Sequence, residues 1–183
     1  CRIIFANIKL IFIMYDSFIS LVRDWYGTDD FIPLHEPRFQ GNEKVYVSEA
    51  IDSTFVSSVS NYVSRFELQL AEYTGARHVV ALSNGTAALH LALHSIGVGP
   101  GDEVITQPLT FVATCNAVKY CGAEPVFVDI AKDTLGLCPD SLANFLEANA
   151  AKSDIGPINK NTGRKIRACL PMHTMGIPVN MPG

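Results

Sequence analysis

The small and polar run Ser83-Asn84-Gly85-Thr86-Ala87-Ala88-Leu89-His90 is the strongest candidate in the sequence for a site that does chemistry. It follows a short apolar run and leads into a stretch with helical spacing, which predicts a turn that opens a helix. The first amides of a helix lack partners within it and lie at its positive end, so they bind anions such as phosphate. Gly85 allows close approach of the backbone, and Thr86 adds a hydroxyl donor. The alternative is a plain turn at Asn84-Gly85 with Thr86 as a helix cap.

A second candidate is the segment Thr106-Gln107-Pro108-Leu109-Thr110-Phe111-Val112-Ala113-Thr114, which joins an apolar run to a helical stretch. Ligands usually bind at the carboxyl edge of a parallel sheet, where this segment is expected to lie. Phe111 could stack there on a flat heteroaromatic ring. The alternative is that Phe111 belongs to the hydrophobic core.

Several familiar motifs are absent from the sequence. It contains no Walker loop and no G-x-G-x-x-G fingerprint, and the glycines of Gly97–Gly101 precede a strand and are interpreted as a loop. No nucleophile elbow and no H-E-x-x-H helix occurs. His90 and His94, one helical turn apart, could ligate a metal, and His173 could face the site, but structural roles are expected for all three.

The composition is that of a globular protein. The 183 residues are 48% hydrophobic and 17% charged, which suffices for one domain with a substantial core. The net charge of −4 lacks the basic character expected of a nucleic-acid-binding protein. The cysteines are odd in number, form no C-x-x-C pair and are interpreted as buried free thiols, which favours a reducing cytoplasm. They are Cys1, Cys115, Cys121, Cys138 and Cys169.

The N-terminal stretch Ile3–Ile13 is apolar, but Asn7 and Lys9 interrupt it. It is too short to span a bilayer and is not followed by the cleavage site of a signal peptide, so no membrane segment is predicted. Met14 is interpreted as the start of translation, and whether the preceding residues are translated stays open.

Helical spacing of apolar residues predicts three helices before the first strand. They are a lead-in helix over Met14–Tyr26, a helix over Tyr62–Tyr73, and between them a helix capped by Asn42 whose one face carries Val45, Tyr46, Ala50 and Ile51. The segment Ile32–Pro37 is expected to be extended over the domain, because its two prolines restrict the backbone. A polar turn with Thr54 and Ser57 separates the last two helices.

From residue 78 onward, short apolar runs alternate with helical stretches. Strands are expected at His78–Leu82, Glu103–Thr106, Pro125–Asp129 and Ile166–Leu170, and helices at Ala87–Ile96, Phe111–Cys121 and Pro139–Ala150. The alternation predicts an α/β fold with a mainly parallel sheet and helices on both faces. The polar stretch Lys152–Lys165 is interpreted as a surface loop or insertion.

An ordered set of short motifs closely resembles the DegT/StrS family of sugar aminotransferases. The motifs are Ser57-Ser58, Glu72–Gly75, Asn84–His90, Gly99–Ile105, Thr110–Thr114, Pro125–Asp129 and His173–Pro178. The resemblance implies an incomplete large domain of the aspartate-aminotransferase type (fold type I) over residues 32–183, after an N-terminal extension and lead-in helix over 1–31. It also implies pyridoxal phosphate (PLP) as cofactor, and transfer of an amino group from glutamate to a nucleotide-linked keto-sugar by a homodimer.

The resemblance also implies roles for single residues. Gly85 and Thr86 fall where the family holds the cofactor phosphate, and Phe111 falls where it stacks on the ring. Thr54 and Ser57 fall where relatives contact the sugar nucleotide, although a simple polar turn is the alternative.

Three segments look most like one branch of the family, which acts on nucleotide-linked 4-keto-6-deoxy amino sugars in legionaminic-acid-type pathways. These segments are Pro33–Phe39, Asp52–Ser58 and the insertion before Cys169.

The chain departs from the family pattern near its C-terminal end. Aminotransfer by PLP needs a lysine that joins the cofactor covalently and a carboxylate that keeps the pyridine nitrogen protonated. In the family both follow the His-x-x-Gly-x-Pro segment, so the lysine is expected beyond Gly183. None of the lysines present lies in the matching motif: Lys9, Lys44, Lys119, Lys132, Lys152, Lys160 and Lys165.

The sequence is therefore interpreted as an N-terminal fragment that is inactive by itself. We expect it to associate through an exposed sheet edge and a dimer surface. Two alternatives for the whole protein stay open. One is a PLP-dependent sugar dehydratase of the same fold, in which histidine replaces the lysine; the other is a non-catalytic truncated paralogue that serves assembly or regulation.

Overall fold

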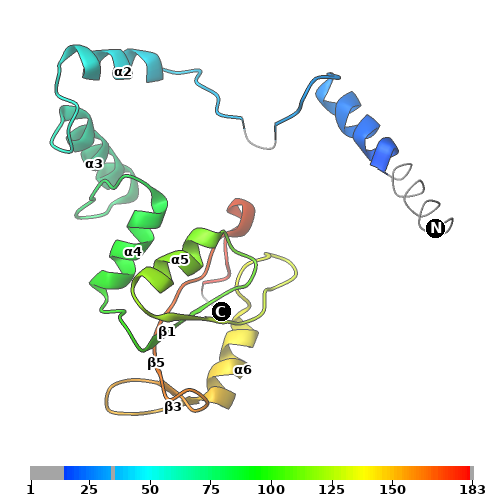
Figure 1. Cartoon of the computed structure of the whole chain (residues 1–183), viewed down its shortest axis with the longest axis vertical. Helices are drawn as coiled ribbons and strands as arrows, with labels where there is room; N and C mark the ends of the chain where they lie inside the picture. Colours follow the sequence, from blue (N-terminus) through cyan, green and yellow to red (C-terminus); the bar gives the residue numbers. More distant parts are fainter. Residues whose placement is uncertain (1–14, 34–35, 182–183) are drawn as a thin grey trace, which may run out of the picture. The chain divides into compact units, whose positions relative to one another are not determined.

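The computed structural model describes residues 15–33 and 36–181 (Figure 1). The chain divides into two compact units, Cys1–Ser60 and Asn61–Gly183, each described here by itself. The predicted boundary between residues 31 and 32 stays a prediction, and the interpretations of Ile3–Ile13 and Met14 lie outside the described residues. Within the described ranges, no helix combines the length and the apolar character that crossing a membrane requires.

The first unit contains two helices. One runs over residues 15–26, as predicted for the lead-in helix, and α2 spans Glu43–Asp52. Asn42 is the N-cap residue of α2, but its backbone is not extended and its side chain makes no capping bond. Instead, the side-chain N–H of Asn42 donates to the Tyr46 hydroxyl at 3.4 Å. Residues 31–33 and 36–40 form neither helix nor strand, which agrees with the expected lack of helix there.

The second unit alternates strands and helices, largely as predicted. The helices are α3 (Asn61–Thr74), α4 (Gly85–Ser95), α5 (Val112–Tyr120), α6 (Pro139–Asn149) and the 3-10 turn η1 (Thr174–Gly176). The strands are β1 (Asp102–Thr106), β2 (Glu124–Phe127), β3 (Ala150–Ala151), β4 (Ile158–Asn159) and β5 (Lys165–Cys169).

The sheet is mixed, with the strand order β2-β1-β5-β4-β3. Strand β1 pairs in parallel with β2 and β5, whereas β4 pairs antiparallel with β3 and β5. The interpretation of Lys152–Lys165 as a loop is therefore wrong in part, because this stretch includes β4. The strand could not be recognised from the mostly polar sequence of this stretch. Asn159 of β4 is held by a hydrogen bond from its side chain to the buried Glu103 rather than by apolar contacts.

The predicted strand His78–Leu82 is wrong, because these residues adopt no regular structure. A strand persists only where its backbone groups pair with a neighbouring strand. No strand among the described residues pairs with this segment. Instead, the backbone N–H of Ala81 donates to the Glu67 carboxylate of α3 at 2.8 Å. Val80 is 69% exposed, so the apolar run is not a core strand here.

Helices cover both faces of the sheet, as predicted (Figure 1). On β1, Val104 packs into a cluster with α4 and α5, and the next residue, Ile105, packs into a second cluster with α6. This alternation follows from the two-residue period of a strand. A register shift between β1 and β5 pairs Ile166 with Glu103 and Ala168 with Val104. Residues two apart on a regular strand lie on the same face. Because of the shift, Ile166 and Ala168 instead pack on opposite faces of the sheet.

The four cysteines among the described residues are free, as predicted. Cys121 is buried between α4 and α5, and burial raises the pKa of its thiol. The prediction that all are buried holds only for Cys121, because Cys115 and Cys138 are half-buried and Cys169 is exposed at the end of β5.

The carboxyl ends of β1 and β5 are joined beyond the strands themselves. The N–H of Leu170 donates to the Ile105 carbonyl at 2.7 Å, and the Thr106 hydroxyl donates to the Leu170 carbonyl at 2.7 Å. Two segments that are far apart in the sequence therefore leave the sheet side by side. One leads to Phe111 at the start of α5, and the other leads to Met172.

Candidate functional site

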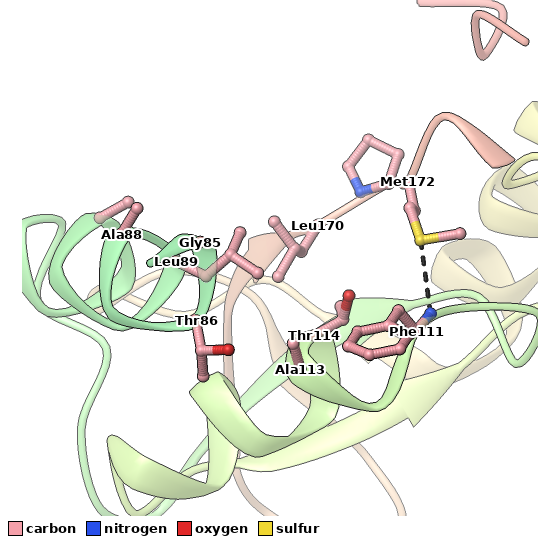
Figure 2. A pocket seen from close by; sticks show the side chains of 11 residues that line it. Gly85, Thr86, Ala88, Leu89, Phe111, Ala113, Thr114, Leu170 and Met172 are labelled. Carbon is pink, nitrogen blue, oxygen red and sulfur yellow. Dashed lines mark hydrogen bonds between the residues drawn. The ribbon is translucent and has the colours of Figure 1, made fainter. Parts of the chain in front are cut away.

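A pocket of about 680 Å³ lies where these two segments meet α4 (Figure 2). Its walls come from α4, from the start of α5 and from the residues that follow β5. It therefore lies at the carboxyl edge of the parallel part of the sheet, where α/β proteins usually bind ligands. Its volume is in the range of sites that hold small molecules and cofactors.

The N-terminus of α4 forms one wall of the pocket. The Asn84 backbone is extended, so its side chain accepts the N–H of Ala87 at 2.9 Å, and its carbonyl accepts the N–H of Ala88 at 3.1 Å. The N–H groups of Gly85 and Thr86 have no partner among the described residues. These two donors lie at the positive end of the helix dipole and adjoin the pocket, so this wall suits an anion.

The alternative assignment of Thr86 as a helix cap is wrong, because Asn84 provides the cap. A Cβ atom added at Gly85 would meet no atom within 4 Å. The space in front of this residue is therefore open.

Phe111 lies on the other side of the pocket. It is the N-cap residue of α5 and is 72% exposed, so the alternative of a core position is wrong. Figure 2 shows Phe111 and Met172 on one side, with Thr86, Ala88 and Leu89 of α4 on the other. The exposed ring leaves a face free for a flat partner.

The sulfur of Met172 links the two segments that leave the sheet. The backbone N–H of Phe111 donates to this sulfur at 3.5 Å, and the Thr110 hydroxyl lies 3.1 Å from it. Thr110 is also 2.8 Å from the Thr114 hydroxyl. These contacts fix the start of α5 against the residues that follow β5.

The pocket lining is mostly apolar. No acidic or basic side chain among the described residues contributes to it. Its capacity to hold an anion therefore depends on the backbone amides of Gly85 and Thr86 and on the Thr86 hydroxyl. Leu89, Ala92 and Leu170 line it with apolar groups, which suit an aromatic ring more than a solvated ion.

Gly85, Thr86 and Phe111 are thus brought together around one pocket, whereas Thr54 and Ser57 belong to the first unit. Both residues are exposed in the turn after α2. Thr54 has a left-handed backbone (φ 59°), and the Ser57 hydroxyl accepts the N–H of Val59 at 3.3 Å. Their contact with a substrate stays a prediction.

His173 and His90 make contacts that fit the structural roles expected of them, and the role expected of His94 stays a prediction. Nδ1 of His173 accepts the backbone N–H of Val179 at 3.0 Å. The His90 ring meets the Tyr120 ring edge-on, with centroids 5.8 Å apart. The described part of the chain contains no group of three or more His, Cys, Asp or Glu side chains that could hold a metal ion.

Two residues of this region were not singled out from the sequence. Gln107 is fully buried at the end of β1, and the signal for it was a polar residue that directly continues a buried strand. Met172 carries no local signal, because its position depends on the pairing of β5 with β1.

Comparisons with known proteins show the family of the chain. Residues 37–183 match the DegT/DnrJ/EryC1/StrS aminotransferase family. A GDP-perosamine synthase from Caulobacter vibrioides is 50% identical over 106 residues, 58% of this chain and 29% of that protein. One from Escherichia coli O157:H7 is 38% identical over 151 residues, 82% of this chain and 37% of that protein.

The fold agrees as well. The crystal structure of a DegT DnrJ EryC1 StrS aminotransferase from Brucella abortus is similar, with a TM-score of 0.66 and 31% identity over 76% of this chain and 35% of that one. The chain thus spans between 29% and 37% of the length of these relatives. Aminotransferases of this family depend on PLP. By its match to the family over residues 37–183, the chain belongs to the DegT/DnrJ/EryC1/StrS aminotransferase family.

Proposed function

We propose that this chain is the N-terminal part of a PLP-dependent aminotransferase that moves an amino group from glutamate to a nucleotide-linked 4-keto-6-deoxy sugar. The family match and the two GDP-perosamine synthases support the class of reaction and of substrate, because GDP-perosamine is a nucleotide-linked amino sugar. The observation that carries the proposal is one pocket that combines unpaired helix amides with an exposed aromatic ring.

The residues at α4 fit the phosphate of PLP. A phosphate that leaves water needs several hydrogen-bond donors. The amides of Gly85 and Thr86 and the Thr86 hydroxyl offer three donors at the positive end of a helix. The open space at Gly85 admits an anion to the backbone itself.

The remaining walls fit the pyridine ring. Phe111 offers a ring face, and aromatic rings that stack offset gain about 1 kcal/mol beyond simple burial. Leu89, Ala92 and Leu170 add apolar groups to the lining, which an aromatic ring can contact.

PLP bound here supplies an electron sink for amino-group transfer. The residues of this chain bind and orient it: Gly85 and Thr86 hold the phosphate, and Phe111 sets the plane of the ring. Lysine is needed for covalent attachment and proton transfer, and no lysine among the described residues lines the pocket. We expect this lysine, and the carboxylate that faces the pyridine nitrogen, to come from protein beyond Gly183.

The finer expectations belong to the same proposal. Thr54 and Ser57 are proposed to bind the sugar nucleotide, and the whole protein is proposed to act as a cytoplasmic homodimer. The narrower substrate, a 4-keto-6-deoxy amino sugar of a legionaminic-acid-type pathway, rests on the segments Pro33–Phe39 and Asp52–Ser58 and on the insertion before Cys169. The 183-residue chain alone is proposed to be inactive.

The test is a transamination assay of the full-length protein with PLP, glutamate and a panel of GDP-, UDP- and dTDP-linked 4-keto-6-deoxy sugars. We expect one keto-sugar to be converted to an amino sugar, with one 2-oxoglutarate formed for each amino sugar, as measured by mass spectrometry. Loss of a sugar hydroxyl without amination would instead identify the dehydratase alternative. No conversion of any sugar by PLP-loaded protein would contradict the proposal.

A further inference from the structure

Gln107 is the most completely bonded buried side chain near the pocket. It is 0% exposed. Its Nε2 donates to the Leu109 carbonyl at 2.9 Å and to the Thr174 hydroxyl at 3.0 Å, and lies 3.2 Å from the Leu135 carbonyl. Its Oε1 accepts the backbone N–H of Met172 at 3.1 Å. The Thr174 hydroxyl in turn donates a hydrogen bond to the Leu135 carbonyl at 2.9 Å.

These bonds hold the two segments that form one side of the pocket. Leu109 lies two residues before Phe111, and Met172 is itself part of the lining. Gln107 therefore holds the segment before Phe111 with its amide N–H and the Met172 backbone with its carbonyl oxygen. The bond from the Phe111 N–H to the Met172 sulfur closes the connection.

Gln107 does not line the pocket itself, so its effect on a ligand passes through Phe111 and Met172. Phe111 and Met172 together are called the aromatic wall of the pocket. We propose that Gln107 is the positioning residue that fixes the place of this aromatic wall, and thereby the plane in which a bound pyridine ring lies. This inference rests on the proposed function for the identity of the ring. The positioning of the wall itself is a property of the chain alone.

A purely structural role has to be separated from positioning, because any buried amide must satisfy its hydrogen bonds. Strand β1 carries a natural comparison at its opposite end. Glu103 is 2% exposed and accepts from Asn159 at 2.8 Å and Thr162 at 2.7 Å. None of these three residues lines the pocket. Asn159→Ala therefore breaks a buried polar network of similar burial without touching the aromatic wall.

The test uses the Met172 methyl group as a probe of the wall in the full-length protein. With 13C-labelled methionine methyl groups, the NMR signal of Met172 is assigned by its loss in Met172→Leu. Phe111→Leu gives the position of this signal when the aromatic ring is absent. We expect Gln107→Leu to move the Met172 signal toward its position in Phe111→Leu, and Asn159→Ala to leave it in place.

A second readout concerns the cofactor. We expect Gln107→Leu to weaken PLP binding roughly tenfold, because two bonds that anchor the wall are lost, and to change the visible circular dichroism of bound PLP. Asn159→Ala should change neither, although it lowers stability. Should Gln107→Leu fail to fold, Gln107→Met is the second variant, since its unbranched side chain adapts to the same space.

The two proposals fail in different ways. A Met172 signal that stays in place in the Gln107 variant, or that moves equally in Asn159→Ala, overturns the positioning role and leaves the proposed function intact. Absence of PLP binding by the wild-type protein, with the Met172 shift still present, overturns the proposed function and leaves the positioning of the wall. In the wild-type protein the Met172 amide should also be protected from hydrogen exchange; exchange at the rate of an unstructured peptide contradicts the bond to Gln107.

Discussion

The backbone N–H of Phe111 donates a hydrogen bond to the sulfur of Met172 at 3.5 Å, which joins the first residue before α5 to the segment after β5. The two residues are 61 positions apart in the sequence. Their contact exists because β1 and β5 are adjacent parallel strands whose carboxyl ends reach the same edge of the sheet. The pocket thus depends on sheet topology as much as on its lining residues.

Replacing Thr86 tests the phosphate contact. Thr86→Val should weaken PLP binding about tenfold or more, since a hydrogen bond to a charged group is worth about 1.5–3 kcal/mol, whereas Thr86→Ser should retain it. Pyridoxal, which lacks the phosphate, should bind equally well to wild type and Thr86→Val in titrations that follow absorbance. Equal weakening of PLP and pyridoxal would show that Thr86 does not contact the phosphate.

Replacing Phe111 tests ring stacking. Phe111→Leu should weaken PLP binding about threefold to tenfold, because a stacked aromatic pair contributes about 0.5–1.5 kcal/mol, and Phe111→Tyr should retain most of the affinity. The melting temperature should change little in either variant, since the side chain is 72% exposed. A large drop in melting temperature with unchanged affinity would assign Phe111 to folding instead.

Two replacements of Asn84 distinguish its role as a helix cap from the effect of a charge beside the pocket. Asn84→Ala should cost about 1 kcal/mol of stability in urea unfolding, because the bond to the Ala87 N–H is lost. Asn84→Asp keeps an equally good cap but adds a negative charge beside the anion site, so it should weaken PLP binding about fivefold. That weakening should diminish at high salt. An Asp variant that binds PLP like wild type would place the phosphate elsewhere.

The Asn159–Glu103 bond should matter for stability alone. Asn159→Ala leaves one oxygen of the buried Glu103 carboxylate without its 2.8 Å partner, which we expect to cost about 3 kcal/mol in urea unfolding. Asn161→Ala is the matched control, since Asn161 is exposed and its side-chain amide donates to Asn149, so its cost should stay within about 0.5 kcal/mol. Equal losses in the free energy of unfolding in the two variants would mean that the buried bond contributes no more to stability than the exposed one.

Local sequence patterns predicted most of the second unit. The helices α3 to α6 and the strands β1, β2 and β5 were predicted because apolar periodicity and flanking turns mark them. The start of α4 could be predicted because its cause, Asn84 before Gly85 and Thr86, is contiguous in the chain.

The remaining features depend on distant partners. Strand β4 has only two residues, and its Asn159 is held by Glu103, which lies 56 residues away, so no periodicity marks it. The run His78–Leu82 has the composition of a strand, but no strand among the described residues pairs with it. Met172 and Gln107 meet only after β1 and β5 have paired, and a local pattern contains no information on that pairing.

The most direct measurement is the crystal structure of the full-length protein with PLP bound. We expect the phosphate within hydrogen-bonding distance of the Gly85 and Thr86 amides, and the pyridine ring stacked on Phe111. A phosphate held away from the N-terminus of α4, or a ring that does not face Phe111, would contradict the assignment of this pocket as the cofactor site.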